Sequence, residues 1–371
     1  MKRLILACVL FLAPAAMMAD SHTPDPAATA LINEIGLQES ATAVRDLPGW
    51  SPPKKIVVRK LWPDQLEQFH AIAPGVEFVE VDGPEAAVAV VTGAQAVLGM
   101  CDEDVLAAEP ALFWIQRYGA GVEKCLANPG MHTGHKLLTN GQKIASPALA
   151  EHAVAMMMML ARGLDIYYAN QLKGEWQRQT ELERTDLAEL AGRTLLVAGL
   201  GGIGTQVAMR GHGLGMHVIA IRNSRRAGPD YVEYVGLPDE LNELATRADV
   251  VINTVPLTDD TRGMFNAAFF DAMKPGAFYI NVGRGATTVT DDLVAALKSG
   301  SIAGAGLDVT DPEPLPRDHP LWTMPRVIIT PHVAGRSDKG LDRLYLLVKE
   351  NLRRYVNGEP MLSVVDIERG Y

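Results

Sequence analysis

Short apolar runs recur at regular spacing through the second half of the chain. Several of them are apolar along nearly their whole length, which is typical of parallel strands buried on both faces of a sheet. The stretches between them are long enough for helices, so the pattern predicts alternating strands and helices around a parallel sheet. The predicted strands are residues 195–198, 217–221, 250–255, 277–282, 304–309 and 327–330.

The first half of the chain repeats this alternation on a smaller scale, which indicates a second and smaller parallel α/β domain. A long helix is predicted from Ser146, because Pro147 suits its first turn. Four consecutive methionines on this helix indicate core packing between layers. A closing helix at 341–356 is expected to return to the first domain. The predicted early elements are strands at 55–58, 76–81 and 96–100 and a helix at 63–71.

The amino terminus has a different pattern. A basic pair at 2–3 is followed by an unbroken apolar run at 4–12 and then by small residues, which is typical of a secretory signal peptide. The apolar run is too short to span a bilayer. Residues 1–19 are therefore predicted to be cleaved from a periplasmic or secreted protein. Translation from Met17 or Met18 would instead give a cytoplasmic protein.

The composition makes the chain acidic. The formal net charge is −10, and it becomes −12 when the signal peptide and its two basic residues are removed. Nucleic acid and anionic membranes are therefore disfavoured as partners. Residues 20–53, rich in Pro, Ala, Ser and Thr, are predicted to form a linker or arm, with one apolar pattern that fits a short helix. Cys101 and Cys125 would either pair in an oxidising compartment or remain isolated buried thiols.

The strand at 195–198 ends in a glycine-rich turn with the spacing Gly199-x-Gly201-x-x-Gly204. In such a unit one glycine makes the turn, one lets backbone amides approach a pyrophosphate, and one lets the helix pack on the strand. The helix N-terminus that follows favours an anion. Because a second strand at 217–221 completes a βαβ unit, the pattern predicts a dinucleotide-binding turn.

Three polar residues, Arg284, Glu313 and His332, each come shortly after one of the last three predicted strands. Doubly wound sheets bind ligands at these carboxyl ends. An arginine, a carboxylate and a histidine would therefore meet beside a bound nicotinamide. Taken singly, each residue would also fit a structural role, as a surface ion pair, a solvated loop residue and a capped core histidine.

Further short motifs accompany these residues, at 150–152, 256–258, 273–277, 283–285, 306–309, 313–316, 320–322, 330–332 and 334–335. Together with the glycine-rich turn they make the chain resemble the D-isomer-specific 2-hydroxyacid dehydrogenases. That family includes glyoxylate/hydroxypyruvate reductases and phosphoglycerate dehydrogenases. The resemblance covers about residues 114–366, and the region before 114 matches mainly as a pattern of strands and helices.

The resemblance implies a role for each polar residue. Arg284, whose planar and permanently charged fork suits an oxoacid, would hold the substrate carboxylate and polarise the keto oxygen. His332 would protonate that oxygen during reduction and act as the base in the reverse direction. Glu313 would orient the imidazole and favour its protonated form. Backbone amides around Ala120 and Gly121 would grip the carboxylate from the other domain.

The resemblance also implies a set of cofactor contacts. His152, on the helix between the domains, is given a structural role between them. No metal ligand is expected. The implied cofactor-binding residues are Gly199, Gly201, Gly202, Ile203, Gly204, Val255, Val282, Asp308 and His332.

One position departs from the NAD form of the family pattern. Arg222 stands at the end of the second strand, where an aspartate would bind the adenosine ribose, and Ser224 and Arg225 follow it. No carboxylate would repel a 2′-phosphate there, and cations and a hydroxyl would hold it. NADP(H) is therefore favoured as the cofactor. The alternative is NAD(H) beside a solvated basic turn.

The implied fold is α/β with two doubly wound parallel-sheet domains. A Rossmann cofactor domain at 149–334 would be inserted into a discontinuous, flavodoxin-like substrate domain at 54–148 and 335–371. The implied reaction is reversible hydride transfer that reduces a small 2-oxoacid to the D-2-hydroxyacid, in a homodimer joined through the cofactor domain. The alternative is a nucleotide-sensing binding protein of the same fold without turnover, as in the C-terminal-binding corepressors.

Overall fold

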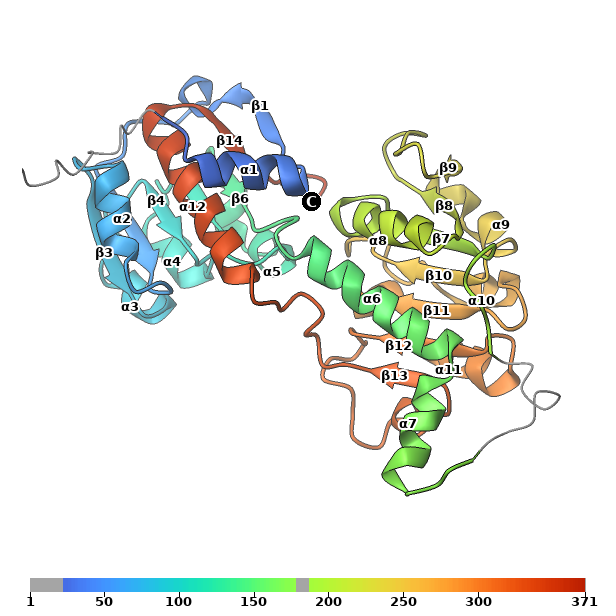
Figure 1. The fold of residues 1–371 in the computed structure, drawn as a ribbon. Helices are drawn as coiled ribbons and strands as arrows, with labels where there is room; N and C mark the ends of the chain where they lie inside the picture. The colour runs from blue at the N-terminus through green and yellow to red at the C-terminus, as the bar shows by residue number, and fades with distance from the viewer. Residues whose placement is uncertain (1–22, 178–186, 371) are drawn as a thin grey trace, which may run out of the picture.

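The computed structural model describes residues 23–177 and 187–370 and divides them between two lobes, each built on a parallel sheet (Figure 1). The predicted signal peptide at 1–19 and both alternative starts lie outside these residues. In the part of the chain that is described, no helix is long and apolar enough to cross a membrane.

The larger lobe contains a seven-stranded sheet with the order β13-β12-β11-β10-β7-β8-β9, and all of its pairings are parallel. This is the Rossmann order, in which the chain reverses direction across the sheet between β7 and β10. Every residue of β10, β11 and β12 is buried, as the apolar runs predict. The strands are β7 (Thr194–Ala198), β8 (His217–Ile221), β9 (Tyr234–Gly236), β10 (Val250–Asn253), β11 (Phe278–Asn281), β12 (Gly304–Leu307) and β13 (Val327–Ile329).

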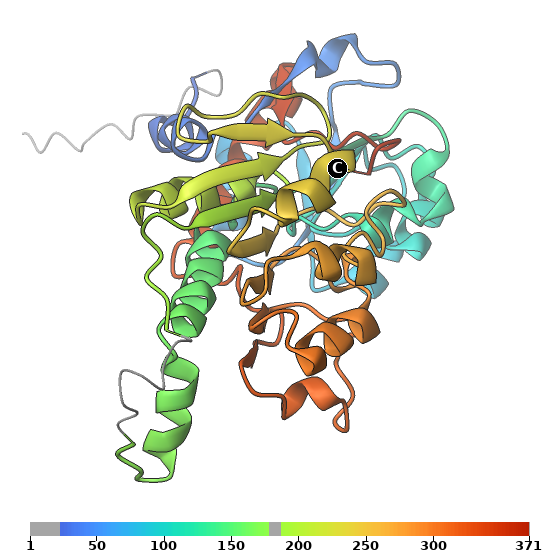
Figure 2. The same cartoon turned by 90° about the vertical axis from the view of Figure 1, so that its right-hand side faces the viewer.

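Helices cover both faces of this sheet, and each face has its own apolar cluster. On one face lie α6 (Ser146–Ala161) and α8 (Gly202–Gly213), where Met156 and Met157 of α6 are buried as predicted. The other face is covered by α9 (Leu241–Ala245), α10 (Ala267–Ala272) and α11 (Thr290–Ser299). Next along the chain from α6, α7 (Leu164–Leu172) projects away from the body of the molecule (Figure 2).

The smaller lobe contains a five-stranded parallel sheet with the order β3-β2-β4-β5-β6, the flavodoxin-like arrangement. The closing helix α12 (Gly340–Asn357) returns to this lobe, as expected, and buries Leu344, Leu347 and Leu352 in its core. The other elements are β2 (Lys55–Arg59), α2 (Gln65–Ile72), β3 (Glu77–Val81), α3 (Pro84–Val88), β4 (Ala96–Leu98), α4 (Glu103–Ala108), β5 (Trp114–Gln116), α5 (Glu123–Leu126) and β6 (Leu137–Thr139).

The short helix predicted within 20–53 is confirmed, but the described part of this segment is folded onto the smaller lobe and is not a free linker. Helix α1 (Pro26–Ile35) buries Leu31 in the core that it shares with α12. Strand β1 (Glu39–Ala43) pairs antiparallel with β14 (Pro360–Leu362). The sequence of β1 has no apolar alternation and its partner lies near the other end of the chain, so local pattern does not reveal this pairing.

Candidate functional site

The glycine-rich turn lies at the switch point of the seven-stranded sheet, directly after β7. Gly199 has a φ of +94°, a backbone conformation that favours glycine. A Cβ on Gly204 would lie 2.0 Å from the carbonyl oxygen of Gly199, so helix α8 approaches the strand this closely only with glycine there. Gly201 has open space where its Cβ would be, and no side chain caps α8. The amides of the first turn of α8, which have no acceptor within the helix, fit a pyrophosphate.

Three other predicted cofactor contacts pack around this turn. A Cβ on Gly199 would lie 3.1 Å from a methyl carbon of Val255, which is buried. Val282 is also buried, and Ile203 is half-buried against the same apolar cluster. Val255 belongs to the apolar cluster on one face of the sheet, and Val282 and Ile203 belong to the cluster on the other face.

Arg284 follows β11, where Asn281 fixes its backbone. The Asn281 amide donates to the carbonyl of Arg284 (3.1 Å), and the Thr287 hydroxyl donates to the same carbonyl (2.7 Å). The side chain crosses to the smaller lobe, where Nε donates to a carboxylate oxygen of Glu123 (2.8 Å). Nη1 donates to the carbonyl of Gly283 (2.9 Å), so the guanidinium is held in one orientation.

Glu123 is a residue of this site that the sequence interpretation missed. It begins α5, two positions after Gly121, and it is half-exposed beside Arg284. A Cβ on Gly121 would lie 2.6 Å from Nη2 of Arg284 and 2.8 Å from a carboxylate oxygen of Glu123. The predicted loop at Ala120 and Gly121 therefore does meet Arg284. The only sequence signal for Glu123 is a carboxylate directly after this glycine loop.

A disulfide ties this loop region to the strand ends of the smaller lobe. Cys101 follows β4 and Cys125 lies in α5, and they form a disulfide with their Cα atoms 5.5 Å apart. Of the two alternatives left by the sequence, the structure shows the paired one. The bond holds α5 at Cys125, two residues after Glu123, and both cysteines are buried.

His332 and Glu313 form the contact that the sequence predicts. Nδ1 of His332 lies 2.7 Å from a carboxylate oxygen of Glu313, and both side chains are about half-exposed. The backbone of His332 has a φ of +53°, which is unusual for a residue with a Cβ and is held by a hydrogen bond from its amide to the carbonyl of Asp308 (2.8 Å). Such strained residues cluster at functional sites.

A buried network supports the loop of His332. Both carboxylate oxygens of Asp308 accept hydrogen bonds, from the Thr330 hydroxyl (2.6 Å) and from the amides of Val333 (2.9 Å) and Ala334 (3.0 Å). Nε2 of His152 lies 2.9 Å from the same Thr330 hydroxyl. His152 therefore connects α6 to this loop within the larger lobe, whereas the role predicted for it is between the domains.

The basic residues at the end of β8 differ in their partners. Arg222 is half-buried and donates to the carbonyl of Ala227 (3.1 Å), whereas Ser224 and Arg225 are exposed. Burial and then the positive charge of Arg225 lower the pKa of Arg222. Arg226, in contrast, pairs with a carboxylate oxygen of Glu240 (2.6 Å). Among the described residues, no carboxylate lies in ion-pair contact with Arg222 or Arg225.

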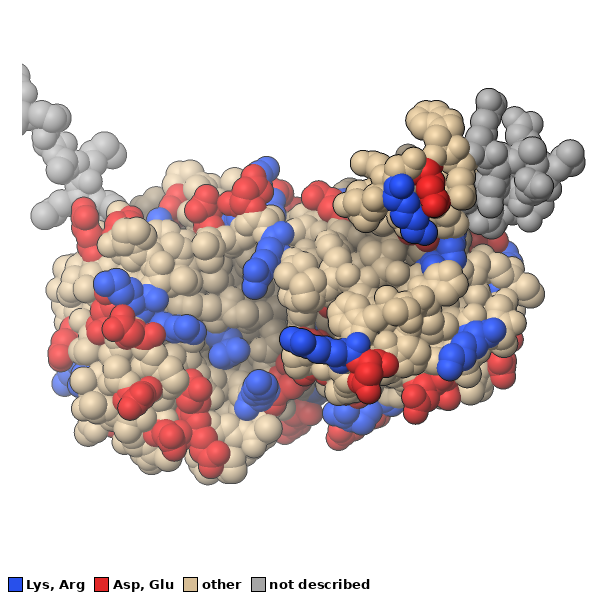
Figure 3. Space-filling view, turned by 90° about the horizontal axis from the view of Figure 1, so that it is seen from below, with Lys and Arg blue, Asp and Glu red and all other residues tan. Residues whose placement is uncertain are grey.

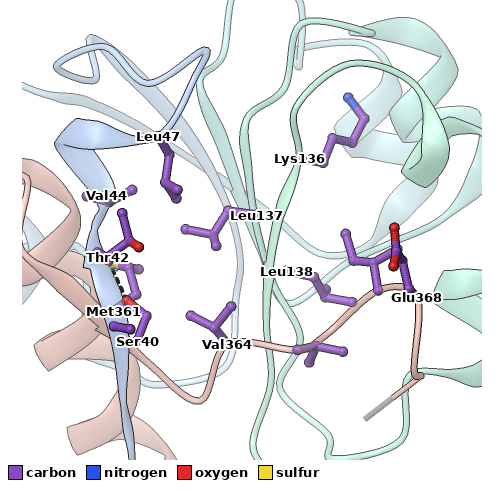
Figure 4. A pocket seen from close by; sticks show the side chains of 13 residues that line it. Ser40, Thr42, Val44, Leu47, Lys136, Leu137, Leu138, Met361, Val364 and Glu368 are labelled. Carbon is purple, nitrogen blue, oxygen red and sulfur yellow. Dashed lines mark hydrogen bonds between the residues drawn. The ribbon is translucent and has the colours of Figure 1, made fainter.

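One cavity of the molecule is lined by none of the predicted site residues. This cavity, of about 370 Å³, lies in the smaller lobe, between β1, β6 and the end of the chain, with Lys136 and Glu368 at its edge (Figure 4). Seen from below, the molecule has acidic and basic side chains interspersed over both lobes, and its surface is hollowed where the lobes meet (Figure 3).

Within 23–177 and 187–370, no group of three His, Cys, Asp or Glu residues could hold a metal ion.

Comparison with known proteins places this geometry in a family. Residues 154–334 match the model of the D-isomer specific 2-hydroxyacid dehydrogenase NAD binding domain. The chain is 35% identical to glyoxylate/hydroxypyruvate reductase A of Photorhabdus laumondii over 275 residues, which are 72% of this chain and 84% of that protein. It is 34% identical to D-3-phosphoglycerate dehydrogenase of Methanocaldococcus jannaschii over 266 residues, which are 71% of this chain and 49% of that protein.

Solved structures give the same result. The NADPH-dependent glyoxylate/hydroxypyruvate reductase of Sinorhizobium meliloti, in complex with NADP and sulfate, matches with a TM-score of 0.72 at 28% identity and covers 86% of this chain and 100% of that chain. A probable 2-hydroxyacid dehydrogenase of Rhizobium etli, in complex with NADP, matches with a TM-score of 0.72 at 26% identity and the same coverage.

Proposed function

The chain belongs to the D-isomer-specific 2-hydroxyacid dehydrogenases, which are NAD(P)-dependent enzymes, and from this premise we propose how its residues carry out the reaction. The substrate is a small 2-oxoacid, and the product is the D-2-hydroxyacid. The observation that carries the proposal is the contact of His332 with Glu313. Glu313 follows β12, and Arg284 follows β11, the neighbouring strand.

Arg284 binds the substrate carboxylate and polarises the keto oxygen. Its Nε and Nη1 are occupied by Glu123 and Gly283, so the guanidinium is oriented before substrate arrives and Nη2 stays available beside Gly121. A fixed fork of this kind holds a carboxylate with strong, directional hydrogen bonds. The dihydronicotinamide ring, when bound, supplies the hydride.

His332 moves the proton. Because the Glu313 carboxylate accepts a hydrogen bond from Nδ1–H, the second ring nitrogen, Nε2, is the one that carries the transferable proton. His332 donates this proton to the keto oxygen during reduction and accepts it in the reverse direction. Glu313 stabilises the imidazolium and fixes the ring orientation.

The test is the His332→Ala variant. We expect turnover to fall about 10²–10⁴-fold, while the Kd for the reduced cofactor, measured by fluorescence titration, stays unchanged. His135→Ala, at an exposed position of the smaller lobe, is the matched control and should keep full activity. Cofactor binding by the wild type without turnover on glyoxylate, hydroxypyruvate or pyruvate would favour the nucleotide-sensing alternative.

We propose glyoxylate or hydroxypyruvate as the substrate and NADPH as the preferred reductant. The names of the relatives support the substrate class, and two relatives carry NADP. Arg222 and Arg225 support NADPH, since neither has a carboxylate partner among the described residues. Initial rates with each oxoacid and with NADPH and NADH separately test both points, and faster turnover with NADH would contradict the cofactor preference.

We propose that the enzyme is a homodimer joined through the larger lobe. Helix α7 and the residues after it form a projecting segment with three exposed apolar side chains. Tyr168 is 55% exposed, Leu172 is 71% exposed and Trp176 is 95% exposed. Exposed apolar patches of this kind mark protein interfaces. Light scattering should give the mass of a dimer, and Leu172→Asp should lower it toward that of a monomer. Leu61→Asp, an exposed leucine on the other lobe, is the control.

We propose that the protein is exported with cleavage near residue 19. The disulfide between Cys101 and Cys125 supports this, because disulfides persist in oxidising compartments. Amino-terminal sequencing of the protein from the periplasmic fraction should show a start near Asp20. Recovery in the cytoplasmic fraction with a start at Met1, Met17 or Met18 would contradict the proposal.

A further inference from the structure

A lysine from the smaller lobe lies across the glycine-rich turn of the larger lobe. Lys143 is in the loop between β6 and α6, three residues before Ser146. Its Cγ lies 2.7 Å from the position that a Cβ on Gly202 would take, and Ser146 Oγ lies 2.9 Å from that position. Gly202 is the first residue of α8. The aliphatic part of Lys143 therefore crosses the first turn of α8, which is where the free amides lie.

The backbone of Lys143 is in an unfavourable conformation for its residue type. Its φ is +67°, in the left-handed region that residues with a Cβ rarely adopt. The loop keeps this conformation with a lysine where glycine or asparagine would fit more easily. Strained residues cluster at ligand-binding and catalytic sites, where the surrounding structure holds them in place.

The ammonium group of Lys143 has no charged partner. It donates to the carbonyl of Gly36, the residue that ends α1. Burial and then the positive charge of Arg222 lower the pKa of Lys143, and the pKa of Arg222 is lowered in turn by burial and by Arg225. The charge of Lys143, from the smaller lobe, therefore interacts with that of Arg222, from the larger lobe, and Arg225 interacts with Arg222. Among the residues that the structure describes, none of the three is paired with a carboxylate.

This arrangement of charges suits an anion of high charge. Like charges held together in a partly buried site repel each other unless a counter-charge joins them. The free amides of α8 and the cationic group point to the same chemistry, because both favour phosphate. A nicotinamide dinucleotide carries phosphate at the pyrophosphate in both forms and at the adenosine 2′ position in NADPH.

We propose that Lys143 is a cofactor-binding residue that places its ammonium on a phosphate group of the dinucleotide. The inference rests on the proposed function, since it requires that the enzyme binds NAD(P). Lys143 exchanges its hydrogen bond to Gly36 for the phosphate when the cofactor binds. Because Lys143 belongs to the smaller lobe, the cofactor then connects both lobes.

The experiment compares two variants by Kd. Lys143→Met keeps the aliphatic contact with Gly202 and removes the charge, whereas Lys143→Arg keeps the charge. We expect Lys143→Met to weaken NADPH binding about tenfold or more in a fluorescence titration, and Lys143→Arg to keep most of the affinity. Lys136→Met is the matched control, because Lys136 is also a partly buried lysine of this lobe whose pKa burial lowers, and its ammonium binds only backbone carbonyls. Its Kd should equal that of the wild type.

Measurements with both dinucleotides locate the contact. An equal loss for NADPH and NADH places Lys143 on the pyrophosphate, and a loss confined to NADPH places it on the 2′-phosphate. If Lys143→Met binds NADPH and NADH as tightly as the wild type does, the inference is overturned and the proposed function stays intact. If the wild type binds neither dinucleotide, the proposed function itself is overturned. Equal weakening by Met and Arg, with a lower unfolding temperature without cofactor, would show a structural role and overturn the inference.

Discussion

Two cationic sites flank the junction of the lobes, and they differ in how their charge is balanced. Arg284 is paired with Glu123 at 2.8 Å and is fixed by Gly283. Arg222, Arg225 and Lys143 have no carboxylate partner among the described residues. The first site is nearly neutral, so its hydrogen-bond directions would decide which ligand it selects. The second keeps its positive charge, which suits an anion with more charge than one carboxylate.

The largest effect should come from the paired site. Replacing Arg284 by Gln removes the group that we propose binds the carboxylate and polarises the keto oxygen, and it leaves Glu123 without its partner. We expect kcat/KM for the 2-oxoacid to fall about 10³-fold, because hydrogen bonds to charged groups contribute strongly and directionally. The Kd for NADPH should not change. A similar loss of NADPH affinity would show that the two sites are not separate.

Removing the disulfide tests whether the site of Arg284 and Glu123 depends on the link between α5 and the end of β4. Replacing both Cys101 and Cys125 by Ser removes the link between α5 and the end of β4. Closing a loop of this length is worth about 3 kcal/mol in the free energy of unfolding, so the double variant should unfold at lower denaturant concentration. KM for the 2-oxoacid should rise while the Kd for NADPH stays constant, since α5 carries Glu123 and not the cofactor turn. An unchanged KM in the folded double variant would show that substrate binding does not depend on the disulfide that holds α5.

The two sites also differ in how well the sequence predicts them. The glycine turn and the position of Arg222 follow from motifs close to the ends of buried strands, where topology fixes their place. The contact of His332 with Glu313 follows from the family resemblance. Glu123 could not be predicted in the same way, since 161 residues separate it from Arg284 and its loop has no strong periodic pattern. Lys143 was also missed, because its contact with the turn depends on how the lobes meet.

The amino-terminal region shows the same limit for the fold. Composition and pattern predict a linker or arm with a short helix at 20–53, and the helix is present as α1. The pattern does not predict that β1 pairs with β14 or that Arg354 of α12 contacts Glu39 of β1 at 2.8 Å. Both contacts join opposite ends of the chain. Local pattern therefore predicts the two sheets and their order of strands, whereas contacts between distant segments require the folded structure.

The unpaired site should control cofactor choice. Replacing Arg222 by Ala removes one of the cations that lack a carboxylate, and we expect the Kd for NADPH to rise about 30-fold with little change for NADH. Raising the ionic strength should weaken NADPH binding by the wild type more than by the variant, because salt screens exposed charges. Arg226→Ala is the control, since Glu240 already neutralises Arg226. Equal losses for both dinucleotides would contradict a role for Arg222 at the 2′-phosphate.

The smallest and most discriminating change is Glu123→Gln, which converts the paired site toward an unpaired one. The amide oxygen of Gln can still accept from Nε of Arg284, so the orientation of the guanidinium is largely kept while its charge is no longer balanced. Weaker positioning should raise KM for the 2-oxoacid about fivefold, since a charge-assisted hydrogen bond becomes a neutral one. The pH dependence of kcat should keep its shape because His332 and Glu313 are untouched. A lower KM would instead mean that Glu123 competes with the substrate carboxylate for Arg284, and the paired site would then be one that the substrate must open.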